Sequence, residues 1–267
     1  MKIKVLYEDA NILAINKPSG ILTQPDQRSK EKTIFDFFIK KYPKLELVHR
    51  LDKETSGVLL LAKNQNAHQF LKSQFMNREL KKVYYAVVSG FVKNDHGFIN
   101  KSIGRSPSDF RRRLSGRGAR GELREAITEY KVLKHFNAKA YQNFYPRGSR
   151  FEPEAPEEGR RGKSFGMPEL FPFTFLEVKP KTGRTHQIRV HMKFLNHPVA
   201  CDSLYNPNGP CPSGFSRLAL HASSIEFKNL KGKIIKVESP LPKEFANLLK
   251  RNHSTKAKLG AGLRSSK

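Results

Sequence analysis

HRLDKETSGVLLLAKN, residues 49–64, sets a polar loop directly before an apolar run. The run, residues 58–62, is short and continuous, which is typical of a strand that is buried on both faces. Gly57 opens the run, and the loop before it carries Asp52, with Arg50 two residues earlier. This stretch therefore predicts a carboxylate at the mouth of a buried strand, with an arginine close to it.

The whole chain is strongly basic, and this charge narrows the class of partner. Its 267 residues are enough for one large domain or two small ones, and lysine and arginine total 50 against 24 acids, a net charge of +26. Each phosphate that a basic side chain neutralises releases a counterion, so an excess of this size favours a polyanion. Nucleic acid is the leading candidate, because no long basic amphipathic helix points to a membrane surface.

The sequence also indicates a compartment. Cys201 and Cys211 are too few for a disulfide framework, which favours a reducing environment. The N-terminal residues alternate in polarity rather than forming the apolar core of a signal peptide. No apolar run approaches the ~20 residues that cross a bilayer. We therefore expect a cytoplasmic protein without membrane association.

Short strands and helices alternate irregularly along the chain, which predicts an α+β fold rather than a doubly wound sheet. Helices are expected from Thr33 to Tyr42, from about Asn66, after Thr182 and at residues 245–249. Strands are expected at residues 3–16 (two, with a turn), 45–48, 58–62, 83–88, 126–133, 173–178 and 219–227.

Three segments are expected to lie outside the core. Residues 105–124 hold seven arginines and two acids, and we interpret them as a mobile basic loop. Their glycines match G-x-G-x-x-G, but no apolar strand precedes them, which excludes a dinucleotide site. Residues 137–172, rich in proline and glycine, are interpreted as a flexible insertion, and residues 250–267 as a disordered basic tail.

Most metal and cofactor sites can be set aside. The two cysteines stand ten apart without C-x-x-C, so a zinc site that used His191 and His197 is a minor alternative. Neither a Walker loop nor a zinc deaminase signature occurs, and acids are too few for an obvious two-metal nuclease. The sequence therefore predicts no cofactor and no metal.

One carboxylate in an arginine-rich setting remains. Alone, Asp52 reads as an aspartate that ties down backbone amides in a loop. TGRTHQIRVHMK, residues 182–193, adds Arg184 and Arg189 around a helix start. Such a cluster can bind phosphate at a helix N-terminus, and Arg189 can also point into a cleft.

Six segments, in this order, resemble the motifs of RluA-type pseudouridine synthases. HRLD is similar to the motif whose aspartate is catalytic in that family. The other five are NKPSG (16–20), KKVYYAVVSG (81–90), TGRTHQIRVH (182–191), HPVACDSLY (197–205) and RLALHA (217–222). One motif would be weak evidence, whereas six in order are strong.

The resemblance implies a fold and an activity. It implies a mixed, mainly antiparallel sheet with flanking helices and a central catalytic cleft, formed by residues 1–249 as one catalytic domain. Many relatives carry a small N-terminal RNA-binding domain, whereas we expect this chain to start directly at the catalytic domain. The implied activity is isomerisation of specific uridines in ribosomal or transfer RNA to pseudouridine, without cofactor or metal. We expect a monomer that needs no protein partner.

The resemblance also implies roles for particular residues. Asp52 would be the reactive carboxylate, acting on the sugar, on the base or in glycal formation. Burial raises the pKa of a carboxyl and a facing cation offsets this, and in the family motif that cation is Arg189. Tyr84 would stack on the flipped uracil, and its neighbour Tyr85 would face the other way.

The remaining candidates would surround the substrate. Arg50 resembles the arginine that fills the space vacated by the flipped base, and Leu220 the apolar residue beneath that base. Lys17 and His49 are candidate neighbours of the site, and Arg184 a candidate phosphate contact. Leu220 and Tyr84 could equally be core residues. The alternative function is a non-catalytic RNA-binding or ribosome-assembly module on the same fold.

Overall fold

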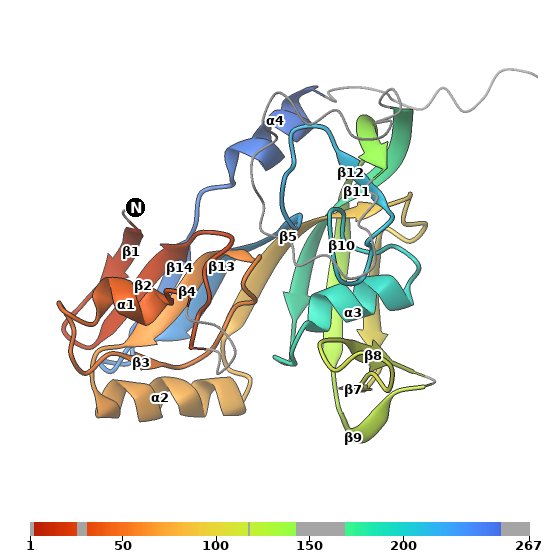
Figure 1. The fold of residues 1–267 in the computed structure, drawn as a ribbon. Coiled ribbons are helices and arrows are strands. Elements are labelled where there is room, and N and C mark those ends of the chain that lie inside the picture. Colours follow the sequence, from red (N-terminus) through yellow and green to blue (C-terminus); the bar gives the residue numbers. More distant parts are fainter. Residues whose placement is uncertain (1–2, 26–30, 117, 143–168, 252–267) are drawn as a thin grey trace, which may run out of the picture.

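The computed structural model describes residues 3–25, 31–116, 118–142 and 169–251 (Figure 1). The helices are α1 (Ile34–Phe38), α2 (Gln65–Met76), α3 (Gln187–Phe194) and α4 (Lys243–Arg251). The strands are β1 (Lys4–Glu8), β2 (Ile12–Lys17), β3 (Glu46–Leu47), β4 (Ser56–Ala62), β5 (Lys81–Ser89), β6 (His96–Asn100), β7 (Ile103–Arg105), β8 (Arg113–Ser115), β9 (Arg120–Arg124), β10 (Ile127–Gln142), β11 (Glu169–Pro180), β12 (Pro210–Pro212), β13 (Leu220–Lys228) and β14 (Ile234–Glu238).

One mixed sheet dominates the described part of the chain. Its main path runs β1-β2-β4-β13-β5-β11-β10-β12, and β3, β14 and β6 pair with β4, β13 and β10. The β4–β13 pairing is parallel, whereas the neighbouring pairs are antiparallel. Strands β8, β7 and β9 form a separate small sheet. The α+β prediction is confirmed.

Strand β4 is buried along its whole length, because a helix covers each face of the sheet around it (Figure 1). Leu59 and Leu61 belong to the core that includes residues of α1. Val58 and Leu60 belong to the opposite core, which includes residues of α2. Alternate side chains of a strand point to opposite faces, so a continuous apolar run is what two covered faces require.

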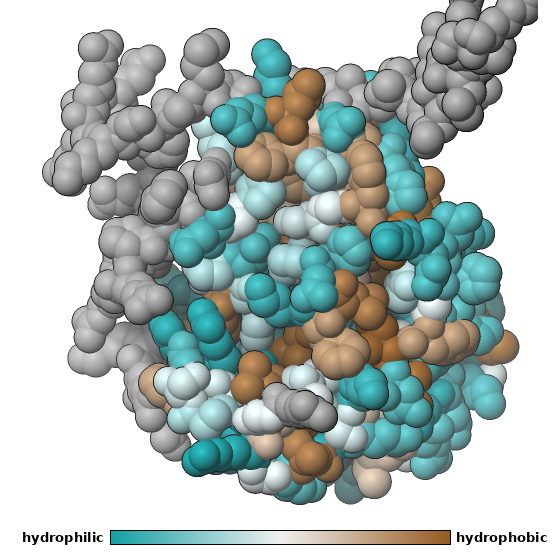
Figure 2. Space-filling view, turned by 90° about the vertical axis from the view of Figure 1, so that its right-hand side faces the viewer, coloured by the Kyte–Doolittle hydropathy of each residue, from teal (hydrophilic) through white to brown (hydrophobic). Residues whose placement is uncertain are grey.

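The other half of the sheet is built on the long β10–β11 hairpin. Phe136, Phe173 and Leu176 belong to its core, and α3 and α4 contribute Met192 and Phe245. Figure 2 views the side of the molecule that carries α3 and the small sheet, where hydrophilic side chains predominate. No helix of the described residues is long and apolar enough to cross a membrane.

The predictions of irregular structure for two segments are partly wrong. Residues 105–124, predicted as a mobile loop, contribute to all three strands of the small sheet. The predicted insertion at 137–172 is too wide: residues 137–140 pair with 169–172 in the β10–β11 ladder. Its central part, 143–168, lies outside the described residues.

Two further details differ from the sequence analysis. Helix α4 extends to Arg251 and so includes the first two residues of the predicted tail, while residues 252–267 lie outside the described residues. Cys201 and Cys211, which were predicted to be too few for a disulfide framework, form a disulfide bond with each other. The chain brings them together because the loop after α3 returns along the edge of β10, where β12 pairs with it.

Gly57 makes the approach of β4 to β13 possible. Its φ is +114°, in the region that side-chain-bearing residues rarely adopt. A Cβ on Gly57 would lie 2.1 Å from the carbonyl oxygen of Ala222, its partner across the ladder. A glycine is therefore required where the loop of Asp52 enters the sheet.

Replacement of Gly57 by alanine is expected to reduce the free energy of unfolding by about 2–4 kcal/mol, since it adds a backbone clash to left-handed strain. Gly232 is a matched control, because its φ is +76° but nothing lies within 4 Å of its Cβ position. Gly232→Ala is expected to cost only about 1 kcal/mol. Urea denaturation measures the stability of both variants. Equal losses of unfolding free energy would show that the close approach of Ala222 does not require a glycine at position 57.

Candidate active site

The turn of Asp52 is held by its own backbone and by the segment after β2. The Thr55 amide donates to the Asp52 carbonyl at 3.1 Å, which closes the turn. The Thr23 hydroxyl donates to the Leu51 carbonyl at 2.7 Å, and the Ser19 hydroxyl donates to the Glu54 carbonyl at 2.7 Å. These contacts fix the backbone on both sides of the aspartate.

Lys17 completes this support. Its side chain is fully buried, and its Nζ donates to the carbonyls of Pro18, Lys53 and Thr55 at 2.9, 2.8 and 2.9 Å. Burial lowers the pKa of Lys17 to about 7, and the Asp52 carboxylate opposes that shift. Lys17 therefore holds the turn in place, because all three of its hydrogen bonds go to backbone carbonyl oxygens.

Lys17→Met preserves the length of the side chain but removes the donor to three carbonyls. We expect it to lower the free energy of unfolding by about 2–5 kcal/mol and to reduce activity, because buried acceptors lose their partners. The exposed Lys44 supplies the control, and Lys44→Met should change stability by less than about 0.5 kcal/mol. A Lys17→Met protein as stable as Lys44→Met would show that the turn does not depend on this lysine.

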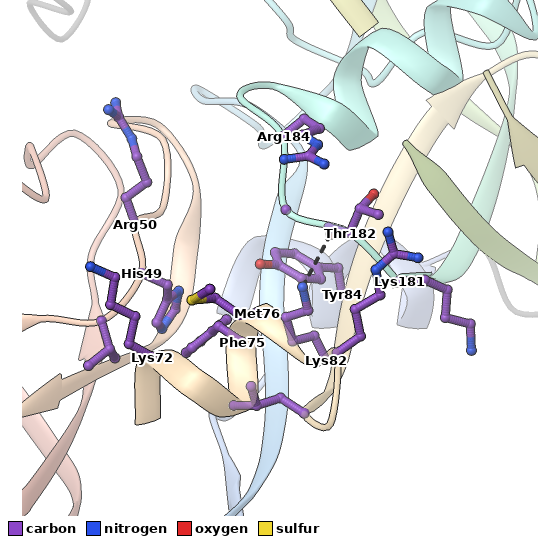
Figure 3. Close-up of a pocket in the computed structure, with 14 residues that line it drawn as sticks. His49, Arg50, Lys72, Phe75, Met76, Lys82, Tyr84, Lys181, Thr182 and Arg184 are labelled. Atoms are coloured by element: carbon purple, nitrogen blue, oxygen red, sulfur yellow. Dashed lines mark hydrogen bonds between the residues drawn. The ribbon is translucent and has the colours of Figure 1, made fainter. Parts of the chain in front are cut away.

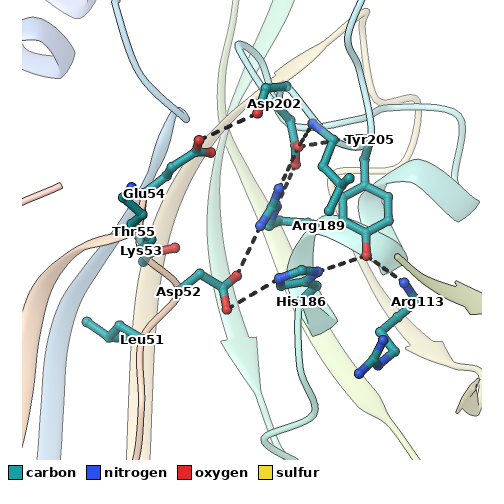
Figure 4. A network of polar contacts seen from close by, with 12 residues as sticks. Leu51, Asp52, Lys53, Glu54, Thr55, Arg113, His186, Arg189, Asp202 and Tyr205 are labelled. Atoms are coloured by element: carbon teal, nitrogen blue, oxygen red, sulfur yellow. Dashed lines mark hydrogen bonds and ion pairs between the residues drawn. The ribbon is translucent and has the colours of Figure 1, made fainter. Parts of the chain in front are cut away.

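Arg189 of α3 approaches the Asp52 carboxylate directly. Its Nη1 lies 3.4 Å from Asp52 Oδ2, so the predicted cation is in place (Figure 4). Asp52 keeps 17% of its side chain exposed, and Arg189 keeps 5%. A guanidinium at this distance stabilises negative charge on a carboxylate that still reaches the cavity.

The stronger partner of Arg189 is Asp202, which the sequence analysis did not identify. The guanidinium makes a bidentate pair with it, through Nε to Oδ2 at 2.7 Å and Nη2 to Oδ1 at 2.8 Å. Asp202 is fully buried, and its Oδ1 also accepts from the amides of Leu204 and Tyr205. Burial alone would lower the pKa of Arg189, but the charge and hydrogen bonds of Asp202, together with the charges of Asp52 and Glu54, outweigh burial and raise it.

The quoted segment HPVACDSLY contains Asp202, but nothing in its spacing shows that the side chain turns inward. That orientation comes from the loop that follows α3, which folds back over Arg189. The only available signal was charge: a buried arginine requires a buried carboxylate.

A third group faces Asp52 from the same side. His186 has φ +57°, and its Nε2 lies 3.9 Å from Asp52 Oδ1. Its Nδ1 is 2.9 Å from the hydroxyl of Tyr205, which accepts from the Arg113 amide at 2.8 Å. Burial lowers the pKa of His186, so its ring is neutral near neutral pH. A strained backbone at a non-glycine residue is typical of functional sites.

Tyr84 and Leu220 border a small cavity beside Asp52. Its volume is about 110 Å³, and Leu51, His186 and Ile188 also line it. Burial raises the pKa of Tyr84, and the nearby Asp52 adds to the shift, so the hydroxyl stays protonated near neutral pH. It can therefore donate a hydrogen bond or stack. Tyr85 instead packs on Phe175, with ring centroids 5.3 Å apart.

The remaining predicted residues differ in exposure to solvent and in whether they line the cavity beside Asp52. Arg50 is exposed and lines the Asp52 cavity, as does Arg184, whose Nε donates to the Glu125 carbonyl at 2.9 Å. His49 does not line this cavity. It accepts from the Leu60 amide at 2.9 Å, and burial lowers its pKa to about 3.

Metal ligands do not gather at this site. Within the described residues, no group of three or more histidines, cysteines, aspartates or glutamates could hold a metal ion.

The chain matches a protein family model and known proteins. Residues 11–194 match the family model of RNA pseudouridylate synthase. Ribosomal large subunit pseudouridine synthase D of Borreliella burgdorferi is 33% identical over 260 residues, which are 92% of this chain and 68% of that protein. The RNA pseudouridine synthase YlyB of Bacillus subtilis is 31% identical, over 93% of this chain and 72% of its own length.

Solved structures share the fold. Human RNA pseudouridylate synthase domain containing 4 superposes with a TM-score of 0.65 at 23% sequence identity, covering 92% of each chain. The corresponding values for human RNA pseudouridylate synthase domain containing 1 are 0.64 and 23%, over 90% of this chain and 84% of that one.

Proposed function

The chain belongs to the RNA pseudouridylate synthase family and is an isomerase, and from this we propose that Asp52 is the carboxylate with which it converts particular uridines of structured RNA. The observation that carries the proposal is one contact. Asp52, in the turn before the buried strand β4, lies 3.4 Å from Arg189 and lines a cavity that is also bounded by Tyr84 and Leu220. Residues 1–249 would form the catalytic domain.

The reaction balances without oxidant, reductant or added group. The bond between C1′ of ribose and N1 of uracil breaks, and a bond between C1′ and C5 forms. C5 loses a proton and N1 gains one. An ionised carboxylate serves this sequence as a nucleophile on C1′, as a nucleophile on the pyrimidine ring, or as a base that assists glycal formation.

The protein side chains have distinct parts in this scheme. Arg189 stabilises the charge of Asp52, while Asp202 keeps the guanidinium in position. Tyr84 stacks on the uracil and offers its hydroxyl proton, with Leu220 beneath the base. The uridine must leave its stack, and Arg50, exposed at the mouth, occupies the space left behind.

Relatives named for the large ribosomal subunit make its RNA the first substrate to test, with transfer RNA second. The net charge of +26 supports phosphate contacts, so affinity should fall steeply with salt. We further propose that the enzyme acts as a cytoplasmic monomer, which light scattering of the purified protein tests for the oligomeric state.

The test uses ribosomal and transfer RNA transcribed in vitro, which carry no pseudouridine. They are incubated with the purified protein, and pseudouridine is mapped by carbodiimide modification and reverse transcription. We expect stops at one or a few uridines. Tight RNA binding without any new stop would instead support the non-catalytic binding module.

A further inference from the structure

A second, larger cavity lies directly beside the one that contains Asp52 (Figure 3). Its volume is about 530 Å³, within the about 300–1,000 Å³ that is usual for ligand pockets. Asp52 does not line it, but Lys82 and Tyr84 of β5 line both cavities. The two cavities are therefore neighbours that share a wall, and the smaller one holds the reactive carboxylate.

The lining of the larger cavity is cationic and contains no acid. Its charged members are Arg50, Lys72, Arg78, Lys82, Lys181 and Arg184. Glu125 and Glu129, outside the lining, pair with Arg78 and Lys181. Among the described residues, no carboxylate forms an ion pair with Arg50, Lys72 or Lys82. The cavity thus presents positive charge that the protein does not neutralise, as expected for an anion site.

Lys82 brings this charge to the wall between the cavities. Its Nζ donates to the Thr182 carbonyl at 3.2 Å, which leaves further donor capacity on the ammonium. Burial lowers the pKa of Lys82 to about 8, so an anion beside it would relieve the cost of burying its charge.

Aromatic side chains lie beside these cations, and Lys82 Nζ is 6.0 Å from the centroid of the Phe75 ring. The rings of His49 and Phe75 are stacked with centroids 4.9 Å apart, and the ring of His49 is neutral near neutral pH. Met76, 74% exposed, stands beside them at the end of α2 (Figure 3). Stacked rings and a thioether are suited to packing against a base, and every base has a face to offer.

We propose that this cavity binds a nucleotide that flanks the target uridine in the same RNA strand. Its phosphate contacts Lys72 and Lys82, and its base packs against His49, Phe75 and Met76. The shared wall allows consecutive nucleotides to occupy the two cavities. This site rests on the proposed function and adds to it a second splayed nucleotide as a substrate requirement.

The test uses a synthetic RNA hairpin that contains a uridine shown by mapping to be converted. Each flanking nucleotide is replaced in turn by an abasic ribose, and kcat/KM is measured. For the wild type, we expect one flanking position at which loss of the base lowers kcat/KM roughly fivefold to a hundredfold, the range of one stacked base.

A variant of the cavity then tests whether the base at that flanking position binds there. Met76→Glu places a carboxylate among the cations at an exposed residue, so the fold should be retained, which thermal melting checks. We expect this variant to have a roughly tenfold lower kcat/KM on the intact hairpin. Its kcat/KM should not fall further when the base is removed at the flanking position to which the wild type is sensitive. Lys250→Ala is the matched control, because it makes the same change in net charge on an exposed residue of α4, away from α2 in Figure 1. It should lose as much kcat/KM as the wild type when each flanking base is removed.

Two outcomes overturn the site while leaving the proposed function intact. One is a wild-type scan that is flat at every flanking position. The other is a Met76→Glu enzyme that loses the same factor as the wild type from each abasic RNA. Failure of the proposed function gives a different result, because the wild type would then convert no uridine in any RNA. The nucleotide site proposed here would then be wrong as well.

Discussion

Asp52→Asn abolishes pseudouridine formation and leaves RNA affinity within about threefold of the wild type: this is the result expected from the site. Asparagine keeps the shape of aspartate but removes the negative charge on which all three proposed roles depend. Removal of a catalytic nucleophile or its partner costs about 10⁴-fold or more in well-studied enzymes, and a similar loss is expected here. Single-turnover conversion and filter binding on the same RNA measure the two effects.

Glu54 provides the control, because it is a second carboxylate in the same turn. Burial raises the pKa of Glu54, and its Oε1 accepts a long contact of 3.5 Å from the Ser203 hydroxyl. Glu54→Gln should retain activity within about tenfold. If Asp52→Asn lost binding together with activity, Asp52 would be a structural residue that ties down its loop, and the proposed role would be wrong.

Arg189→Ala should impair stability as well as rate. It leaves Asp202 fully buried without its cation, and breaking a buried pair in this way costs about 3–5 kcal/mol of unfolding free energy. It also removes the positive charge that faces Asp52, so activity should fall even where the protein is folded. Arg189→Lys should keep part of the activity, since a point charge can pair with one carboxylate oxygen. Urea denaturation and single-turnover conversion are the measurements.

A double variant separates the two functions of the arginine. Arg189→Leu with Asp202→Asn removes both buried charges and keeps an oxygen that can accept from the Leu204 and Tyr205 amides, and removal of both members of a buried ion pair is often neutral or stabilising. We expect it to recover most of the lost stability and none of the lost activity. Activity that returned with stability would show that Arg189 supports the fold alone and contributes nothing to the charge of Asp52.

The sequence was most informative where a strand is buried on both faces. The run at 58–62 predicted β4, and the cap at Thr33 predicted the start of α1, because both signals are local. The approach of Arg189 to Asp52 was expected only from the resemblance, since 137 residues separate them and no local pattern joins them.

The sequence failed where local signals were weak or conflicting. Strand β9 is exposed at every residue, so it carries no alternation of polarity to distinguish it from a loop. The end of β10 does alternate, with Phe136, Ala138 and Ala140 buried, but the prolines and glycines that follow dominated the composition. The left-handed backbone of His186 and the inward orientation of the Asp202 side chain have no local sequence pattern, and these side chains contact Tyr205 and Arg189.

Release of tritium from RNA labelled at C5 of uridine tests the central claim most directly, because that hydrogen leaves only when C5 forms its bond to the sugar. The wild type should release one tritium for each pseudouridine found by mapping, and Asp52→Asn should release none above background. No release by the wild type, or release by Asp52→Asn at the wild-type rate, would contradict the assignment of uridine isomerisation to Asp52.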